Sequence, residues 1–141
     1  MKIALERVNE DYLFRTTNSN GHHILLDNKS KTTGEVLGIS PMELLLMGVA
    51  GCSSIDIVAI LNKQKINPTS LKMDVEGLRH EGAVPALFYQ IDITIHLEGD
   101  FSEEKAKRAA QLSFEKYCSV SKTLEPTAKI NHHIILNGIA L

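Results

Sequence analysis

The sequence predicts an α+β fold that contains antiparallel sheet. Alternating hydrophobic and polar residues, the pattern of half-buried strands, occur near the N-terminus and again over residues 71–76 and 90–98. Helical segments are expected over residues 40–61 and, as a pair, over 102–124. The order of three strands, a helix, two strands, two helices and a last strand is typical of an α+β domain.

Length and composition indicate one domain over residues 1–141, because 141 residues are too few for two domains of ordinary size. Hydrophobic residues make up 43% and charged residues 23% of the chain, which excludes a disordered protein. Fifteen Lys and Arg against 17 Asp and Glu give a net charge of -2. Nucleic-acid binding usually requires a basic excess, so we expect no nucleic-acid partner.

The first strands form a meander. Residues 3–8 and 12–17 are rich in strand-forming residues, and the returning strand is expected over 22–26. Asn20 and Gly21 supply the turn before it, because this pair tolerates the positive φ angles of a tight hairpin. Residues 27–38 are expected to form an exposed connection.

A helix is expected to begin at Ser40-Pro41-Met42-Glu43. Ser40 can cap the free N–H groups, Pro41 suits the first helical position, and Glu43 complements the helix dipole. The residues that follow are apolar on nearly every face, so this helix should be buried all round. Because a domain of this size can hardly surround it, we expect part of its surface to meet a second copy in a homodimer.

The same segment is long enough to raise the question of a membrane span. Glu43 and Asp56 lie near its ends, and serines and glycines lie at its centre, which is costly in lipid. We therefore expect no membrane association. Residues 1–7 reach charged side chains too soon for a secretory signal, so we expect a cytoplasmic protein.

In the second half, strands over residues 71–76 and 90–98 form a second hairpin. Ser102 caps the next helix, a short helical run follows over 119–124, and residues 128–136 form the last strand.

The two cysteines are the main candidates for chemistry. Cys52 lies midway along the apolar helix, and Cys118 lies at the junction of two helices. A thiol beside Lys116 and Lys122 at a helix start is expected to have a lowered pKa. The alternative is a packing role for each cysteine, since free cysteine is often a small buried hydrophobic residue.

No metal or cofactor is expected. Adjacent residues of a strand point to opposite faces, so neither His22-His23 nor His132-His133 can easily chelate one ion. No phosphate-binding glycine loop, nucleophile elbow or paired-cysteine zinc spacing is present.

These residues carry a family resemblance. The segment Ser40 to Cys52 and the segment Glu115-Lys116-Tyr117-Cys118-Ser119-Val120, whose cysteine follows Cys52 by 66 residues, resemble the osmotically inducible protein C and organic hydroperoxide resistance (OsmC/Ohr) superfamily. The stretch from Arg79 to Phe88 fits the same pattern, so the likeness spans nearly the whole chain.

The resemblance implies antiparallel sheets around long central helices, in an intertwined homodimer with two active sites at the subunit interface. It implies a peroxidase in which Cys52 attacks an organic hydroperoxide and Cys118 closes a disulfide. A small dithiol or a dithiol protein would restore both thiols, and the role would lie in the oxidative stress response.

One difference from the peroxidase branches concerns the residues that tune the cysteine. There a glutamate directly after the helix-starting proline pairs with an arginine of the meander. Here Met42 takes that position and Glu43 follows, about 100° further round the helix. Arg15 is the only arginine of the second and third strands. Arg15 and Glu43 are thus possible supporting residues, or else a solvated strand residue and a helix-dipole acid. This chain is accordingly identified with a less characterised OsmC-like branch.

Three functions compete. The first is a thiol-dependent peroxidase that reduces organic hydroperoxides through Cys52 and Cys118. The second is a non-catalytic dimer that binds a small hydrophobic ligand. The third is a thiol redox sensor, in which the same thiols oxidise but turnover is slow.

Overall fold

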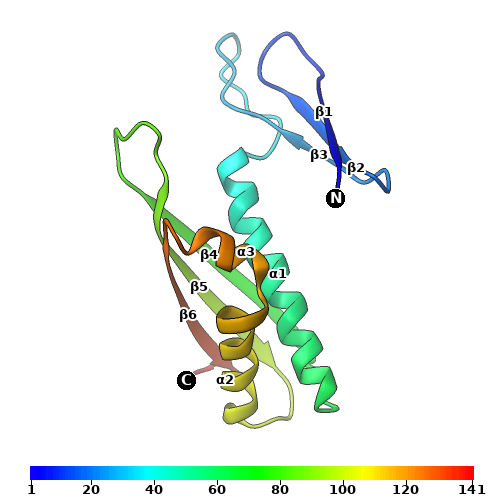
Figure 1. Ribbon diagram of the computed structural model, residues 1–141, viewed down its shortest axis with the longest axis vertical. Coiled ribbons are helices and arrows are strands. Elements are labelled where there is room, and N and C mark those ends of the chain that lie inside the picture. The colour runs from blue at the N-terminus through cyan, green and yellow to red at the C-terminus, as the bar shows by residue number, and fades with distance from the viewer. The chain divides into compact units, whose positions relative to one another are not determined.

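A computed structural model describes all 141 residues, which form two compact units, Met1–Leu45 and Leu46–Leu141 (Figure 1). Each unit contains its own sheet, and helices complete the second. The predicted α+β fold is confirmed. That the chain is one domain over residues 1–141 stays a prediction.

The first unit contains the predicted meander. Strands β1 (Ile3–Arg7), β2 (Phe14–Asn18) and β3 (His23–Leu26) pair antiparallel in that order. Gly21 has a φ of 84° in the turn between β2 and β3. Only glycine adopts this angle without a steric cost, which explains the turn signal in the sequence.

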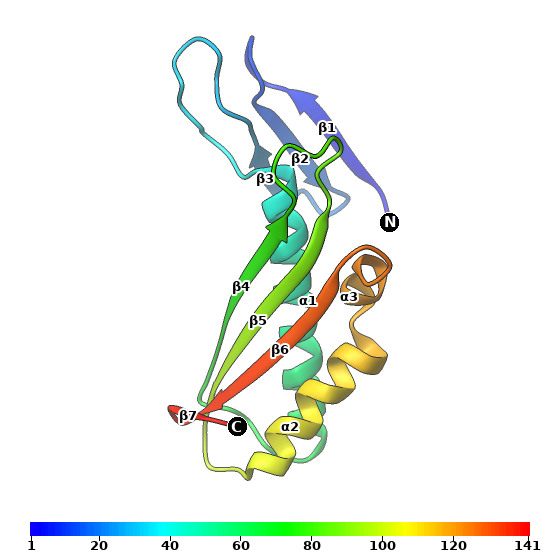
Figure 2. The same ribbon diagram turned by 90° about the vertical axis from the view of Figure 1, so that its left-hand side faces the viewer.

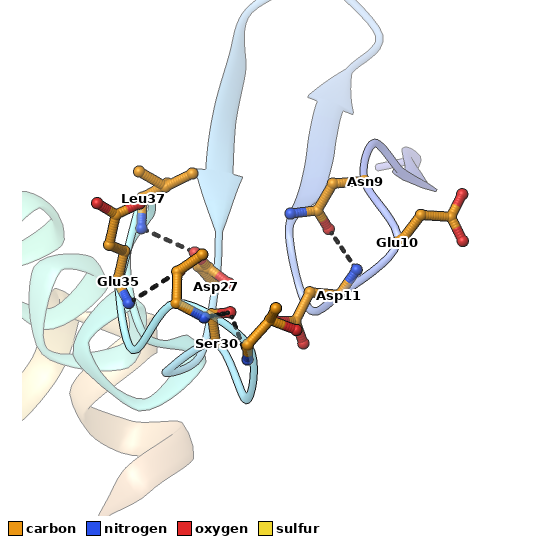
Figure 3. Close-up of a pocket in the computed structure, with 9 residues that line it drawn as sticks. Asn9, Glu10, Asp11, Asp27, Ser30, Glu35 and Leu37 are labelled. Carbon is orange, nitrogen blue, oxygen red and sulfur yellow. Dashed lines mark hydrogen bonds between the residues drawn. The ribbon is translucent and has the colours of Figure 1, made fainter.

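The connection after β3 is ordered around one buried carboxylate (Figure 3). Asp27 is 7% exposed, and its two oxygens accept hydrogen bonds from the N–H groups of Asn28 at 2.7 Å and Leu37 at 2.8 Å. These bonds fold residues 27–37 back on themselves. The predicted exposed connection is therefore correct for most of its residues and wrong for Asp27.

Helix α1 (Pro41–Lys63) begins where the capping residues predict. Its buried residues lie on one stripe: Val49, Ser53, Ile57, Ile60 and Leu61. A single copy of the chain does not bury α1 on every face, because Met47 is 50% and Ile55 is 72% exposed. By length and composition alone, α1 also qualifies as a candidate membrane span.

The second unit contains a sheet in the order β4-β5-β6-β7. Strands β4 (Ser70–Arg79) and β5 (Phe88–Glu98) form the predicted antiparallel hairpin. Strand β6 (Lys129–Leu136) pairs parallel to β5, and the two-residue β7 (Ile139–Ala140) pairs antiparallel to β6. One strand pair thus differs from the predicted antiparallel arrangement, because a helical crossover returns the chain to the same end of the sheet.

That crossover consists of α2 (Glu103–Leu112), the π-helical turn η1 (Ser113–Tyr117) and α3 (Ser119–Leu124). Within this unit the helices lie on one face of the sheet (Figure 2). The core between the layers is formed by alternate residues of β5 and small residues of α2: Ile91, Ile93, Ile95, Leu97, Ala106, Ala109 and Ala110. This layer positions η1 and α3 beside α1.

Candidate functional site

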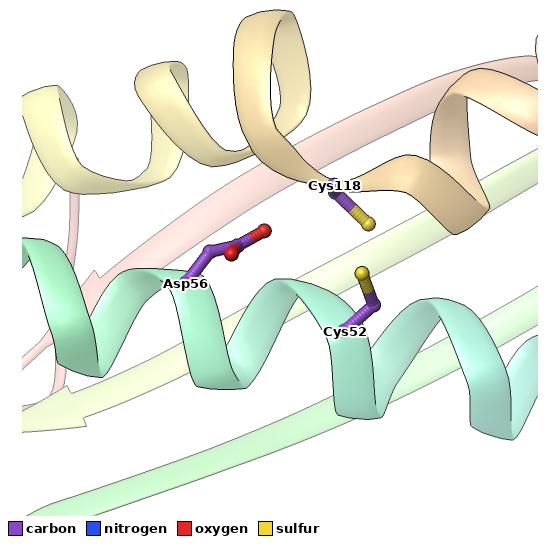
Figure 4. Close-up of side chains that lie close together, drawn as sticks. All are labelled: Cys52, Asp56 and Cys118. Carbon is purple, nitrogen blue, oxygen red and sulfur yellow. The ribbon is translucent and has the colours of Figure 1, made fainter.

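The structure brings Cys52 and Cys118 together (Figure 4). Their Sγ atoms, with a carboxylate oxygen of Asp56, all lie within 4.8 Å of one another. Cys52 is supplied by the middle of α1, and Cys118 by the residue between η1 and α3. Both thiols are free. Disulfide formation would bring the two sulfurs from within 4.8 Å of each other to about 2.05 Å.

A local irregularity of the backbone places Cys118. The N–H of Cys118 donates to the carbonyl of Ser113 at 2.7 Å, which closes the π-helical turn, and extended backbone follows at Cys118. The Ser121 N–H then donates to Cys118 Sγ at 3.4 Å at the start of α3. Such π-helical turns are frequent at functional sites.

The two thiols differ in exposure. Cys118 is 0% exposed, whereas Cys52 is only partly buried. Of the two, Cys52 is therefore the thiol that a small molecule can reach.

The prediction that nearby lysines lower the pKa of Cys118 is wrong. Burial raises the pKa of the Cys118 thiol, because a buried thiolate loses its hydration; Ser121 hydrogen bonds oppose this rise, and Cys52 adds to it. Both lysines contact other side chains. Lys122 Nζ pairs with Glu125 at 2.9 Å, and Lys116 Nζ lies 5.4 Å from the centre of the Tyr117 ring.

The Glu43 side chain caps the N-terminus of α1, the helix on which it lies. Its carboxylate accepts a hydrogen bond from the Ser40 N–H at 2.9 Å, while Ser40 Oγ accepts one from the Met42 N–H at 3.3 Å. This is a capping box, in which side chains satisfy the free N–H groups of the first turn. The interpretation of Glu43 as a helix-terminus residue fits these contacts.

Arg15 forms an ion pair with a different acid. Arg15 Nη1 lies 3.1 Å from Glu6 Oε1, and the two residues face each other across β1 and β2. Both side chains are exposed, so the pair contributes at most about 1 kcal/mol. Within the first unit, Arg15 and Glu43 therefore pair with different partners and not with each other.

Two further residues at the cysteine pair were missed by the sequence analysis. Asp56 follows Cys52 by four residues, so helical spacing could have placed it on the same face of α1. Ser113 Oγ lies 3.4 Å from Asp56 Oδ2 and 3.4 Å from the Ser53 carbonyl oxygen. No signal in the sequence indicates that contact, because 57 residues separate Ser113 from Asp56.

This chain is similar to a known protein family and to a curated protein. Residues 32–133 match the family model described as OsmC-like protein. Protein YhfA of Escherichia coli K12 is 37% identical over 124 residues, which cover 87% of this chain and 89% of YhfA.

Two solved structures share the fold. The OsmC-like protein of Mycoplasma pneumoniae has a TM-score of 0.80 at 24% identity, covering 96% of this chain and 95% of the other. The organic hydroperoxide resistance protein OhrB of Bacillus subtilis has a TM-score of 0.64 at 17% identity, covering 94% and 96%. The family match and the identity to YhfA show that this chain belongs to the OsmC-like protein family.

Proposed function

We propose that this protein is a thiol-dependent peroxidase that reduces organic hydroperoxides. The observation that carries the proposal is the proximity of two free thiols of unequal exposure, Cys52 and Cys118. Membership of the OsmC-like family supports a redox role. The accessible Cys52 is the nucleophile, and the buried Cys118 is the resolving thiol.

In the first step, the Cys52 thiolate attacks the terminal oxygen of the hydroperoxide. The O–O bond breaks, Cys52 becomes a sulfenic acid, and the alkoxide takes up a proton and leaves as an alcohol. The hydroperoxide is reduced by two electrons and the sulfur is oxidised by two.

In the second step, Cys118 attacks the sulfenic sulfur of Cys52. An S–S bond forms, and the hydroxyl leaves as water with the thiol proton of Cys118. A small dithiol or a dithiol protein then reduces the disulfide by exchange and is itself oxidised to a disulfide. No metal or organic cofactor is required for this cycle.

We infer that the working form is a homodimer in the cytoplasm. A hollow on α1 is lined by residues of a single helix: Ser54, Ile55, Val58, Ala59 and Asn62. Exposed apolar area is unfavourable by about 25 cal/mol per Å². A second copy that covers this face of α1 would remove that cost, and a reducing compartment would keep the thiols ready for turnover.

A redox sensor is the second candidate. The contacts of Glu43 with Ser40 and of Arg15 with Glu6 favour it, because neither side chain is left free to stabilise a thiolate. A sensor would form the same disulfide but would turn over slowly.

Steady-state turnover separates the candidates. Purified protein is given cumene hydroperoxide with dihydrolipoamide as reductant and a chelator to remove metals. We expect sustained consumption by the wild type and none by Cys52→Ser. One equivalent consumed per subunit without further turnover would favour the sensor, and no consumption would favour the non-catalytic ligand-binding dimer.

A further inference from the structure

The cysteine pair has a third polar neighbour that the peroxidase chemistry does not use. Asp56 lies one helical turn after Cys52 on α1, and one of its carboxylate oxygens lies within 4.8 Å of both sulfurs (Figure 4). Two thiols and a carboxylate from two chain segments thus converge on one point.

Two of these donors are held in place by hydrogen bonds from outside the cluster. Ser113 Oγ lies 3.4 Å from Asp56 Oδ2, and the Ser121 N–H donates to Cys118 Sγ at 3.4 Å. Ser113 and Ser121 are both buried. Metal ligands are typically oriented by outer partners of this kind.

Asp56 is not part of any ion pair. The ion pairs of the chain join Arg15 to Glu6, His96 to Asp74, Lys107 to Glu103 and Lys122 to Glu125. The Asp56 carboxylate is therefore left without an ion-pair partner, and a divalent cation would supply the neutralising charge.

We propose that the reduced protein binds one zinc ion through Cys52 Sγ, Cys118 Sγ and a carboxylate oxygen of Asp56. Two sulfur donors favour zinc over magnesium or calcium, which prefer oxygen alone. Tetrahedral zinc with Zn–S bonds of about 2.3 Å needs sulfurs about 3.8 Å apart. The present limit of 4.8 Å requires a closure of at most about 1 Å.

Binding replaces the two thiol protons by Zn²⁺ and releases them to solvent. Three protein ligands leave the fourth position for water, the arrangement of an open zinc site. The inference goes beyond the proposed peroxidase, because it needs the thiols reduced but no reaction with peroxide. This site differs from the expectation of no metal, because its donors are the two cysteines and Asp56 and not the histidine pairs.

Cobalt provides a spectroscopic test, since Co²⁺ is coloured and replaces Zn²⁺ in tetrahedral thiolate sites. Reduced, metal-free full-length protein is titrated with Co²⁺ and then with Zn²⁺. We expect one Co²⁺ per chain with thiolate-to-cobalt charge-transfer absorption, which Zn²⁺ abolishes by displacement. Absence of that absorption at saturating Co²⁺ overturns the proposal.

Variants identify the ligands. Cys52→Ser and Cys118→Ser should each lose the charge-transfer band or most of it. Asp56→Asn keeps the size of the side chain and should weaken cobalt binding at least as much as loss of an outer partner, about 10- to 100-fold. The matched control Asp74→Asn removes an exposed carboxylate of β4 and should bind like the wild type.

Binding by Asp56→Asn with wild-type affinity would overturn the three-donor site, as would Co²⁺ binding that survives both cysteine variants. Because Asp56→Asn leaves both thiols in place, it decides the case even where a cysteine variant fails to fold by circular dichroism. Peroxidase turnover is measured with chelator present, so failure of the zinc site and failure of the proposed function are separate results.

Discussion

Cys52 and Cys118 have different surroundings, so replacing each one should impair the reaction at a different step. Cys52→Ser removes the thiolate that cleaves the O–O bond, so hydroperoxide consumption should vanish even in the first turnover. Cys118→Ser keeps that step and loses the resolving thiol. It should consume about one equivalent per subunit and accumulate a sulfenic acid that dimedone labels.

Rapid-quench measurement of the hydroperoxide checks this prediction. The folding of both variants is verified by circular dichroism. Equal loss of the first turnover in both variants would mean that the two cysteines do not have these separate roles.

The buried position of Cys118 predicts an unusual pH dependence of its alkylation. Burial raises its pKa, and only the thiolate reacts, so the fraction that reacts at a given pH is smaller than for a free thiol. In Cys52→Ser, the rate of reaction with iodoacetamide should rise to half its maximum at a pH above about 8.5, the value of an unperturbed cysteine.

Using the midpoint of the pH profile separates ionisation from access, since burial slows the reaction at every pH. Cysteine in an unfolded peptide of the same sequence is the control. A midpoint below that of the peptide would contradict the pKa direction inferred from the structure.

The hydrogen bonds in the first turn of α1 predict that Glu43 contributes to the stability of the protein and not to its reaction with hydroperoxide. Ser40→Ala removes the acceptor for the Met42 N–H and should lower the free energy of unfolding by about 1 kcal/mol. Glu43→Ala removes the other half of the capping box and should lower it by a similar amount. Hydroperoxide consumption per folded subunit should be unchanged in both.

Urea unfolding followed by circular dichroism gives the free energies, and the turnover assay gives the activity. Arg15→Lys, which keeps the charge opposite Glu6, is the matched control and should change neither quantity. Loss of activity in Glu43→Ala greater than in Ser40→Ala would assign the carboxylate a role at the cysteine.

Local sequence signals predict some of these helices and strands but not how all of the strands pair. The meander, α1 and the β4–β5 hairpin were predictable because each depends on local signals, such as alternation, the Ser40 cap and the turn at Gly21. The parallel pairing of β5 with β6 was not, since alternation identifies a strand but not its partner. The two-residue β7 is too short to give any pattern.

The same distinction applies to the site. The residue types and the family resemblance singled out Cys52 and Cys118, but only the folded chain shows that their sulfurs meet. The pKa of Cys118 shifts in the direction opposite to that expected from Lys116 and Lys122, because burial dominates the shift and Lys122 pairs with Glu125. Burial by other elements decides the shift, and burial of a helix junction has no local sequence signal.

The exposed apolar face of α1 predicts that two copies of the protein associate as a homodimer. Ile55 is 72% exposed at the centre of the helix, and a lysine there would place a charge in the proposed interface. Light scattering at micromolar concentration should give a dimer for the wild type and a monomer or unfolded chain for Ile55→Lys. The matched control, Ile139→Lys, changes an isoleucine of β7 that is 65% exposed and should remain dimeric.

A wild-type protein that is monomeric and well folded at this concentration would contradict the dimer. Recovery of the protein only in a detergent-extracted membrane fraction would contradict both the dimer in solution and the expected absence of membrane association.

In the proposed mechanism Cys52 and Cys118 form one redox unit, and a single stoichiometric oxidation tests this pairing. Reduced protein receives one equivalent of cumene hydroperoxide per subunit in the presence of chelator, and free thiols, cumyl alcohol and cross-linked peptides are measured together. Two thiols should disappear, one alcohol should form, and mass spectrometry should find an intrachain Cys52–Cys118 peptide that reduction separates. Two thiols remaining, or oxidation of Cys118 with Cys52 untouched, would contradict it.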